Sequence, residues 1–392
     1  MNEIIAIVSQ LIIFLLIFSF PLNPSLLNKI LLPKNYHFGT FDTLLINGVF
    51  ILNFLLLCSF LNLELKNIFY TLIFISIFIN IFNFNKWKKY LVKEKINIYF
   101  FLVICLCIFF GLANNLKFEW DGIAHWFFKT KSFYDGHDVS NIKNLPASNY
   151  PYLGTYLWAF FWKNAVIEYE YLGRLIYIFI FILSIFSISC SIIKKKDFDI
   201  LFVFPIVLVI TVLTYDEYLF GGYQEYLLFS FMALMSKLIL NIISNNSSSI
   251  KQLLILIFTG NLLIYFKDEG IVYLILIFFI FQFFLKKNLH RSIVAISSII
   301  IITIQFILEK NIIQAVGFQE NLMDININYI LNFNFIITNS ILIIKYLIIS
   351  ILKYPIWIIT FVSIYTIMKN KLDQKLIYFL LLMILGIFGF YY

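Results

Sequence analysis

The sequence has little charge and few helix-breaking residues. Only 13% of its 392 residues are charged and 62% are hydrophobic, and it contains 14 glycines and seven prolines. Soluble domains carry about 25% charged and about 50% apolar residues. A water-soluble fold is therefore excluded. Apolar runs long enough to cross a hydrocarbon core of roughly 30 Å recur along the chain, so we expect an all-α polytopic membrane protein.

The sequence also lacks the motifs of several kinds of chemistry. Its cysteines lie in apolar runs, which favours small apolar side chains over disulfides or metal ligands; they are Cys58, Cys105, Cys107 and Cys190. We find no phosphate-binding glycine loop, zinc-spaced His or Cys, GxSxG or internal repeat, which argues against ATP-driven chemistry. The net charge of +8 is explained by lysine-rich cytoplasmic loops, so no nucleic-acid partner is expected.

The apolar runs predict about 12 transmembrane helices. They cover 3–20, 40–62, 67–84, 97–113, 172–193, 198–214, 226–243, 251–266, 271–285, 292–308, 355–369 and 376–392. An aromatic, proline-led segment at 149–166 suits an interfacial or re-entrant helix better than a span, and 327–353 could be a span or a helix of that kind. We divide the chain into N-terminal transmembrane helices at 1–96 and a transmembrane core at 97–392, which contains an outer loop at 114–170.

The basic residues near the helix ends predict the orientation. Lysine-rich clusters occur at 86–95, 194–196, 286–291 and 369–375. All four can be cytoplasmic if 149–166 and 327–353 lie along the outer surface. Most acidic residues then face outward, and topology rules do not require this. A binding or catalytic site on the outer face would explain the bias, and plain polarity of short loops is the alternative.

The first acidic cluster lies in the long outer loop, at Glu119 and Asp121. Residues 121–134 predict an amphipathic helix on the membrane surface. Its two arcs would carry Ile123, Trp126, Phe127, Phe133 and Tyr134 on one side, and Asp121, His125, Lys129 and Ser132 on the other. Asp121 falls in the first turn, where a carboxylate can also act simply as an N-cap.

Two further acidic clusters follow in short outer loops. Asp216 and Glu217 precede a glycine pair, and Asp268 and Glu269 lie in a very short loop between two spans. Lys267 is the obvious partner for Asp268. Charges at this depth are costly and are usually paired or functional. Three clusters at one depth could converge on one cavity, where a carboxylate can act as a general base, bind a divalent cation or orient sugar hydroxyls.

Three basic residues are expected on the same face as these acids. Lys129, Lys131 and Arg174 could hold a phosphate, although contact with lipid headgroups is an alternative for each of them.

This pattern resembles the GT-C superfamily of membrane glycosyltransferases, which includes the dolichyl-phosphate-mannose protein mannosyltransferases and bacterial lipid-sugar transferases. The motif EWDGIAHW at 119–126 is similar to the family's catalytic acid after an early span. Asp216 and Glu217 resemble a later acidic pair, KDEG at 267–270 looks like a family loop, and NYPYLGTYLWAFFW resembles the end of the first outer loop. The likeness covers roughly residues 97–290. Three spans precede it and no soluble C-terminal domain follows, which suggests a compact, lipid-modifying type.

The resemblance implies a polyprenyl-phosphate sugar donor, inverting transfer to a lipid-linked or cell-envelope acceptor, and a site facing the periplasm of a bacterial inner membrane. Asp121 would be the general base beside Glu119. The substrate would contact the other two clusters together with His125, Lys129, Lys131 and Arg174. A basic residue or a divalent cation would ease departure of the lipid phosphate. Membrane lipids are the other expected partners.

Two other functions remain open from the residues. A transporter or lipid flippase would use outward acids as ligands, but such proteins usually show paired halves and broken helices. A polysaccharide polymerase is also polytopic, but it relies on outward arginines, and this chain has only Arg174 and Arg291.

Overall fold

The computed structural model describes residues 2–31, 38–120, 122–148, 150–192, 221–245 and 248–308, with a few isolated helical positions beyond residue 340. Within these residues the chain contains helices and loops but no strands, so the expected all-α class is confirmed for this part. The α-helices are α1 (Asn2–Phe18), α2 (Pro24–Leu31), α3 (Thr40–Phe60), α4 (Leu65–Lys93), α5 (Lys95–Asn114), α6 (Phe128–Tyr134), α7 (Leu153–Lys163), α8 (Glu170–Ile192), α10 (Glu225–Asn245), α11 (Ile250–Phe266), α12 (Glu269–Gln282) and α13 (Asn288–Leu308). A π-helix, η1 (Gly122–Phe127), precedes α6, and a 3-10 helix, η2 (Val139–Asn144), follows it.

Six of the described helices are long and apolar enough to cross a membrane. They are α3, α4, α5, α8 over Glu170–Cys190, α10 and α13. Three more, α1, α11 and α12, are apolar but shorter. The 14 residues of α12 span about 21 Å, which is less than a hydrocarbon core of roughly 30 Å. The described part of the chain is therefore a bundle of apolar helices of the kind found in membrane proteins.

Each predicted span within the described residues corresponds to one helix. The largest difference is in α4, which continues to Lys93 through the basic cluster instead of ending near residue 84. The predicted spans at 198–214, 355–369 and 376–392, and most of the stretch at 327–353, lie outside the described residues.

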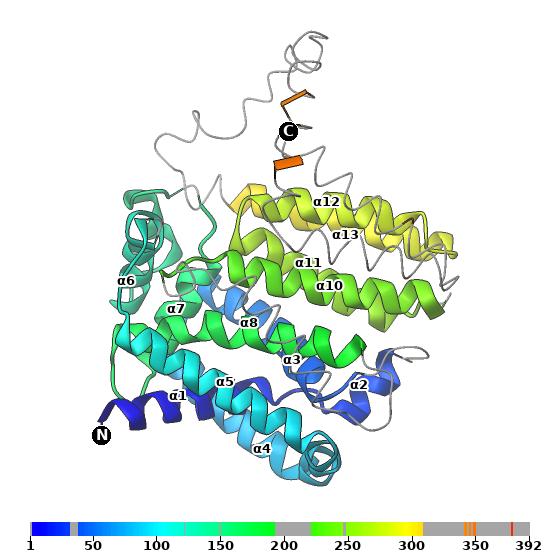
Figure 1. Cartoon of the computed structure of the whole chain (residues 1–392). Coiled ribbons are helices and arrows are strands. Elements are labelled where there is room, and N and C mark those ends of the chain that lie inside the picture. The colour runs from blue at the N-terminus through cyan, green and yellow to red at the C-terminus, as the bar shows by residue number, and fades with distance from the viewer. Residues whose placement is uncertain are drawn as a thin grey trace.

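The helices run up and down the bundle, so their ends gather at two opposite ends of it (Figure 1). One end carries the start of α8 and the short helices α6 and α7, and we call it the α7 end. Here Asn164 donates to the carbonyl of Leu65 with an N to O distance of 3.4 Å. The other, the α2 end, carries α2. Here the side chain of Asn241 donates to the carbonyl of Leu31 at 3.1 Å.

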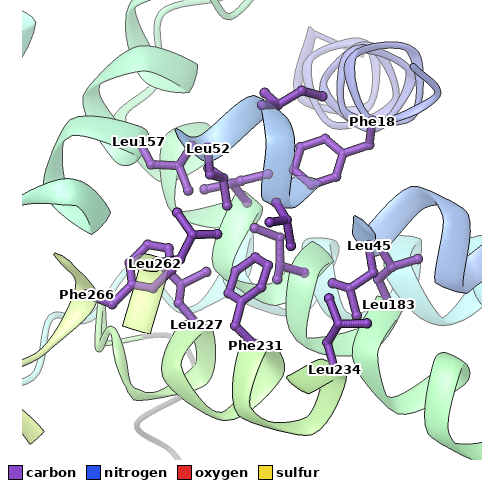
Figure 2. Close-up of a cluster of buried hydrophobic side chains, with 14 of the residues drawn as sticks. Phe18, Leu45, Leu52, Leu157, Leu183, Leu227, Phe231, Leu234, Leu262 and Phe266 are labelled. Carbon is purple, nitrogen blue, oxygen red and sulfur yellow. The ribbon is translucent and has the colours of Figure 1, made fainter. Parts of the chain in front are cut away.

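The core lies between α8 and the helices that surround it. Helix α8 packs against α3, α5, α7 and α10, and 94% of its spanning window is buried. Figure 2 shows apolar side chains of α1, α3, α7, α8, α10 and α11 meeting in one cluster; the labelled ones are Phe18, Leu45, Leu52, Leu157, Leu183, Leu227, Phe231, Leu234, Leu262 and Phe266. By contrast, only 22% of the α4 window and 17% of the α13 window are buried. Such broad apolar surfaces suit contact with lipid.

The segment at 149–166 differs from its expected place. It forms α7, and the 11 residues of that helix are too few to cross a membrane, as expected. However, residues 153–162 are all buried, against α6, α8, α3, α4 and α11. Its aromatic side chains pack among neighbouring helices on every side, which fits the re-entrant alternative and not a helix lying on the surface.

The described acidic residues gather at the α7 end, and only Asp42 and Glu94 lie at the α2 end. Those at the α7 end are Glu3, Glu64, Glu119, Asp135, Asp138, Glu168, Glu170, Glu225, Asp268 and Glu269. The two basic clusters that the structure describes, at 86–95 and 286–291, are at the α2 end, where His290 Nδ1 is hydrogen-bonded to Ser248 Oγ. The clusters at 194–196 and 369–375 are outside the described residues. The bundle is therefore acidic at one end and basic at the other.

Candidate functional site

The three predicted acidic clusters differ in how far the structure describes them. Asp121 and the pair Asp216 and Glu217 lie outside the described residues. Glu119, Asp268 and Glu269 are described, and so are the glycines that follow the masked acids in sequence. The site is built below from these flanking residues.

Residues on both sides of Asp121 contact the segment that follows the second cluster. A methyl group at Gly221 would lie 2.6 Å from Cγ of Glu119, and one at Gly122 would lie 2.0 Å from the carbonyl oxygen of Gly221. Neither position has room for a side chain, because one at Gly122 would meet backbone and one at Gly221 would meet the first two side-chain carbons of Glu119. The glycines thus allow two segments about 100 residues apart to lie in direct contact.

Glu119 is paired at this contact. Its carboxylate is 3.0 Å from Nζ of Lys117, and its side chain is mostly buried. Trp120 next to it is exposed, and its ring centroid is 5.0 Å from that of His125. This loop therefore presents a carboxylate, an imidazole and an indole beside position 121.

Arg174 is a buried residue that contacts both loops of the site, at Lys117 and at Gly222. It lies one turn into α8, with a side chain only 2% exposed. Its Nε and Nη2 atoms each donate to the Glu170 carboxylate at 3.0 Å, and Nη1 donates to the carbonyl of Lys117 at 3.4 Å. The guanidinium also stacks 4.3 Å from the ring centroid of Phe118. This paired arginine fixes the first loop to α8, so its predicted contact with a phosphate would have to coexist with Glu170.

The turn before α10 completes the site. Gly222 has a φ of +88°, a backbone conformation that favours glycine, and it packs against Trp158 and Arg174. Gln224 is fully buried, and both polar atoms of its amide have no hydrogen-bond partner. A buried amide in this state marks a place where a ligand or a water can bind. Sequence reasoning missed Gln224, because a single glutamine carries no pattern.

The loop of the third cluster is joined to α10 by an ion pair. Lys267 pairs with Glu225, the first residue of α10, a contact that the sequence analysis did not predict. Asp268 is exposed, and Glu269 lies half-buried in the first turn of α12. The third cluster therefore reaches the site through α10, and its own acids lie at the edge.

The prediction that 121–134 forms a helix with the named polar arc is wrong. Residues 122–127 form a π-helix and only 128–134 an α-helix, so the register of the arcs changes between them. Lys129 is fully buried, and its Nζ donates to the carbonyl of Tyr150 at 2.7 Å. Lys131 is exposed and pairs with Asp135 at 2.6 Å. Lys129 therefore anchors the loop, and Lys131 belongs to its surface.

A polar cavity of about 300 Å³ opens at the same end of the bundle. Its lining includes Glu64, Lys66, His137, Asp138, Tyr156 and Lys163. The Tyr156 hydroxyl is buried there without a hydrogen-bond partner. Hydrogen bonds from Ser140 and Asn141 hold the pKa of Asp138 below its ordinary value. The cavity therefore combines the Asp138 carboxylate, which stays ionised at neutral pH, with lysines and a hydroxyl that has no hydrogen-bond partner.

Tyr134 and Lys163, which both line this cavity, make further contacts there. The hydroxyl of Tyr134 donates to Glu168, which raises the pKa of Tyr134 to about 12. The Nζ of Lys163 lies 4.3 Å from the centroid of the same ring.

The described residues offer no group of three or more His, Cys, Asp or Glu side chains that could hold a metal ion. Because Asp121, Asp216 and Glu217 are not among them, the predicted divalent cation stays a prediction.

Sequence reasoning also missed a buried ionic cluster at the α2 end. Lys237 of α10 pairs with Asp42 of α3, and its Nζ donates to the carbonyl of Ser187 at 2.9 Å. Nearby, Glu94 accepts a hydrogen bond from the backbone of Thr40 at 2.9 Å. In the sequence, Asp42 and Lys237 are visible only as single charges within apolar runs, and nothing in the sequence shows that the fold brings them together.

Glu170 was missed as well, although its spacing of four residues from Arg174 is typical of helical ion pairs.

No family model, curated protein or solved structure matches this chain. Its function is therefore argued from its own residues.

Proposed function

We propose that this protein is an integral membrane glycosyltransferase of GT-C-like architecture with about 12 spans. It moves a sugar from a polyprenyl-phosphate donor to a lipid-linked or cell-envelope acceptor. In this proposal the α7 end faces the periplasm of a bacterial inner membrane, and Asp121 is the general base.

One observation carries the proposal. Glu119 and Gly122, on either side of Asp121, both pack against Gly221, which lies four residues after Glu217. This contact supports the idea that acids from two distant loops work at one site. The buried Arg174 and the unpartnered amide of Gln224 lie against the same turn. A general base, a cation that stabilises the leaving phosphate and an amide that can hydrogen-bond a hydroxyl are groups that sugar transfer uses.

In the reaction we propose, Asp121 accepts the proton of an acceptor hydroxyl as that oxygen attacks the anomeric carbon of the donor. The bond between that carbon and the phosphate oxygen breaks, and the lipid phosphate leaves with the electron pair. Positive charge near the departing phosphate, from Arg174 or Lys117, stabilises it. Attack opposite the leaving group inverts the configuration.

The polar cavity supports a saccharide substrate. Its volume of about 300 Å³ is at the lower limit of the roughly 300–1,000 Å³ that small-molecule sites occupy. Its carboxylates can accept hydrogen bonds from sugar hydroxyls, and the Tyr156 hydroxyl can both donate and accept them.

The decisive experiment compares Asp121→Asn with Glu3→Gln. Both remove one carboxylate near the α7 end, but Glu3 is exposed and does not line the polar cavity. With a radiolabelled polyprenyl-phosphate hexose as donor, we expect Asp121→Asn to lower transfer at least about 100-fold, the usual minimum for loss of a general base. Glu3→Gln should transfer normally. Full transfer by Asp121→Asn, in membranes that contain normal amounts of the protein, would contradict the assignment.

A transporter or lipid flippase is the second candidate, favoured by the buried pair of Asp42 and Lys237. Ionisable residues inside a bundle of membrane helices commonly mark ion or proton pathways. The discriminating measurement is pH-driven proton uptake into proteoliposomes by the wild type and by Asp42→Asn. Uptake that needs Asp42, together with absence of sugar transfer, would favour transport over the transferase. A polysaccharide polymerase gains no support from the described residues.

A further inference from the structure

A second cavity, of about 420 Å³, lies at the α2 end, away from the candidate site. It is lined by α1, α3, α4 and α5, of which α1, α4 and α5 lie along the lower part of the bundle in Figure 1. Each helix contributes residues from its half nearer the α2 end, among them Leu15, Leu44, Phe84 and Leu102. The cavity is therefore a groove confined to one half of the bundle thickness.

The length of the groove fits one leaflet of a bilayer. On α4 its lining runs from Asn80 to Leu91, which is about 16 Å at a rise of 1.5 Å per residue. Half of a hydrocarbon core of roughly 30 Å is about 15 Å. A hydrocarbon chain of one leaflet can therefore lie along it.

The lining is almost wholly apolar, and one of its few polar groups has no hydrogen-bond partner. Ser19 and Asn80 are hydrogen-bonded to each other. The hydroxyl of Thr40 is different: the residue is 3% exposed, lines the groove, and its Oγ1 has no hydrogen-bond partner. A buried hydroxyl in this state indicates a missing partner, such as the ester oxygen of a lipid.

Two lysines stand at the basic end of this groove. On α4 the lining stripe includes Phe84 and Leu91, and Lys88 lies about one turn from each. On α5 Lys95 lies one turn before Ile98, the first lining residue of that helix. Both lysines are exposed. They place two positive charges where a groove-bound chain would meet its headgroup.

We propose that this groove binds an acyl chain of an anionic glycerophospholipid, whose phosphate is held by Lys88 and Lys95. The apolar lining takes the chain, Thr40 bonds an ester oxygen, and the lysines select negative charge. Trp87, which lines the groove and precedes Lys88 on α4, suits the interface between hydrocarbon and headgroup. The site is separate from the proposed transferase chemistry and stands without it.

The test is native mass spectrometry of the full-length protein in detergent. The protein is supplied with equal amounts of phosphatidylglycerol and phosphatidylcholine that carry identical acyl chains. We expect the wild type to retain phosphatidylglycerol preferentially. Lys88→Gln with Lys95→Gln should reduce this preference about fivefold for each lysine.

The matched control is Lys89→Gln with Lys93→Gln. These lysines are exposed on the same helix, but its period of about 3.6 residues places them opposite the lining stripe. They should leave the lipid preference unchanged. Equal retention of the two lipids by the wild type, or an equal loss in both double variants, would overturn the proposal.

Filling the groove tests the acyl chain separately. Leu15→Trp and Leu102→Trp each add bulk to the lining and should reduce retention of both lipids, whereas Ile296→Trp, at an exposed position of α13, should not. Undiminished retention in both groove variants would rule out this binding place. If one tryptophan variant does not fold, the other tryptophan variant and the lysine variants still test the proposal.

Discussion

At the scale of single residues, the arginine of the site is held by a partner on its own helix. Breaking a buried ion pair leaves a charge without compensation, and Arg174 is almost completely buried. We predict that Glu170→Gln lowers the free energy of unfolding by about 2–4 kcal/mol. Thermal unfolding of the detergent-purified protein measures this. Asp135→Asn, which breaks an exposed pair, should change stability by about 0–1 kcal/mol. Equal effects of the two variants would show that Arg174 does not depend on Glu170.

We predict that the contact between the two segments needs Gly122, because glycine has no side chain. In Gly122→Ala the new methyl group would meet the carbonyl of Gly221, so the two segments must separate and sugar transfer should fall at least about tenfold, since misplacement by 1 Å can cost about 100-fold. Ile123→Ala, at the neighbouring exposed position, is the control and should retain activity. Helical content measured by circular dichroism should be unchanged in both. Normal transfer by Gly122→Ala would mean that this contact is not part of the site.

At the residue level, we named Glu119 and Arg174 from their residue types in the sequence. Both contact the same turn, Glu119 at Gly221 and Arg174 at Gly222, and their roles in chemistry stay predictions. Lys129 was expected in water and is buried instead. A π-helix changes which residues share a face, and nothing in the sequence of 121–134 signals such a turn.

At the scale of elements, α7 is the helix whose role was least visible in the sequence. It is short and aromatic, which is typical of interfacial helices, yet it is packed on all sides. Whether an aromatic helix lies on a membrane or inside a bundle depends on which elements cover it. Those elements come from distant parts of the chain, so local pattern cannot decide.

The burial of α7 has a measurable consequence. Amides of a packed helix exchange only when the surrounding structure opens. We predict that residues 154–162 exchange with deuterium much more slowly than residues 139–148, although both belong to the same loop region. Hydrogen exchange with mass spectrometry in detergent tests this. Similar rates in the two segments would show that α7 is only loosely packed.

At the scale of the whole molecule, the opposite charges of the two ends predict the topology. The basic end should be cytoplasmic. In a background without the native cysteines, His137→Cys at the α7 end should react with an impermeant reagent added outside the cell. Lys287→Cys at the α2 end should react only after the membrane is opened. Both positions are exposed. Labelling of both from the same side would refute the arrangement.

The bundle as a whole was largely predictable, because apolar runs of about 20 residues have few other uses. The positions of α3, α5, α10 and α13 agree with the predicted spans within a few residues. Their packing was not predictable. The ionic cluster at the α2 end joins α3, α8 and α10, and its members are single polar residues within otherwise apolar helices.

That cluster has a consequence for how the protein is made. Lys237 follows Asp42 by 195 residues, so α3 is synthesised long before its partner charge exists. Arg174, in contrast, emerges with Glu170 on the same helix and is neutralised from the start. During biosynthesis the Asp42 side chain must therefore stay hydrated or be shielded by another protein until α10 leaves the ribosome. The lateral assembly of α3, α8 and α10 is thus a late step of insertion, and chains that end before α10 should be substrates for membrane quality control.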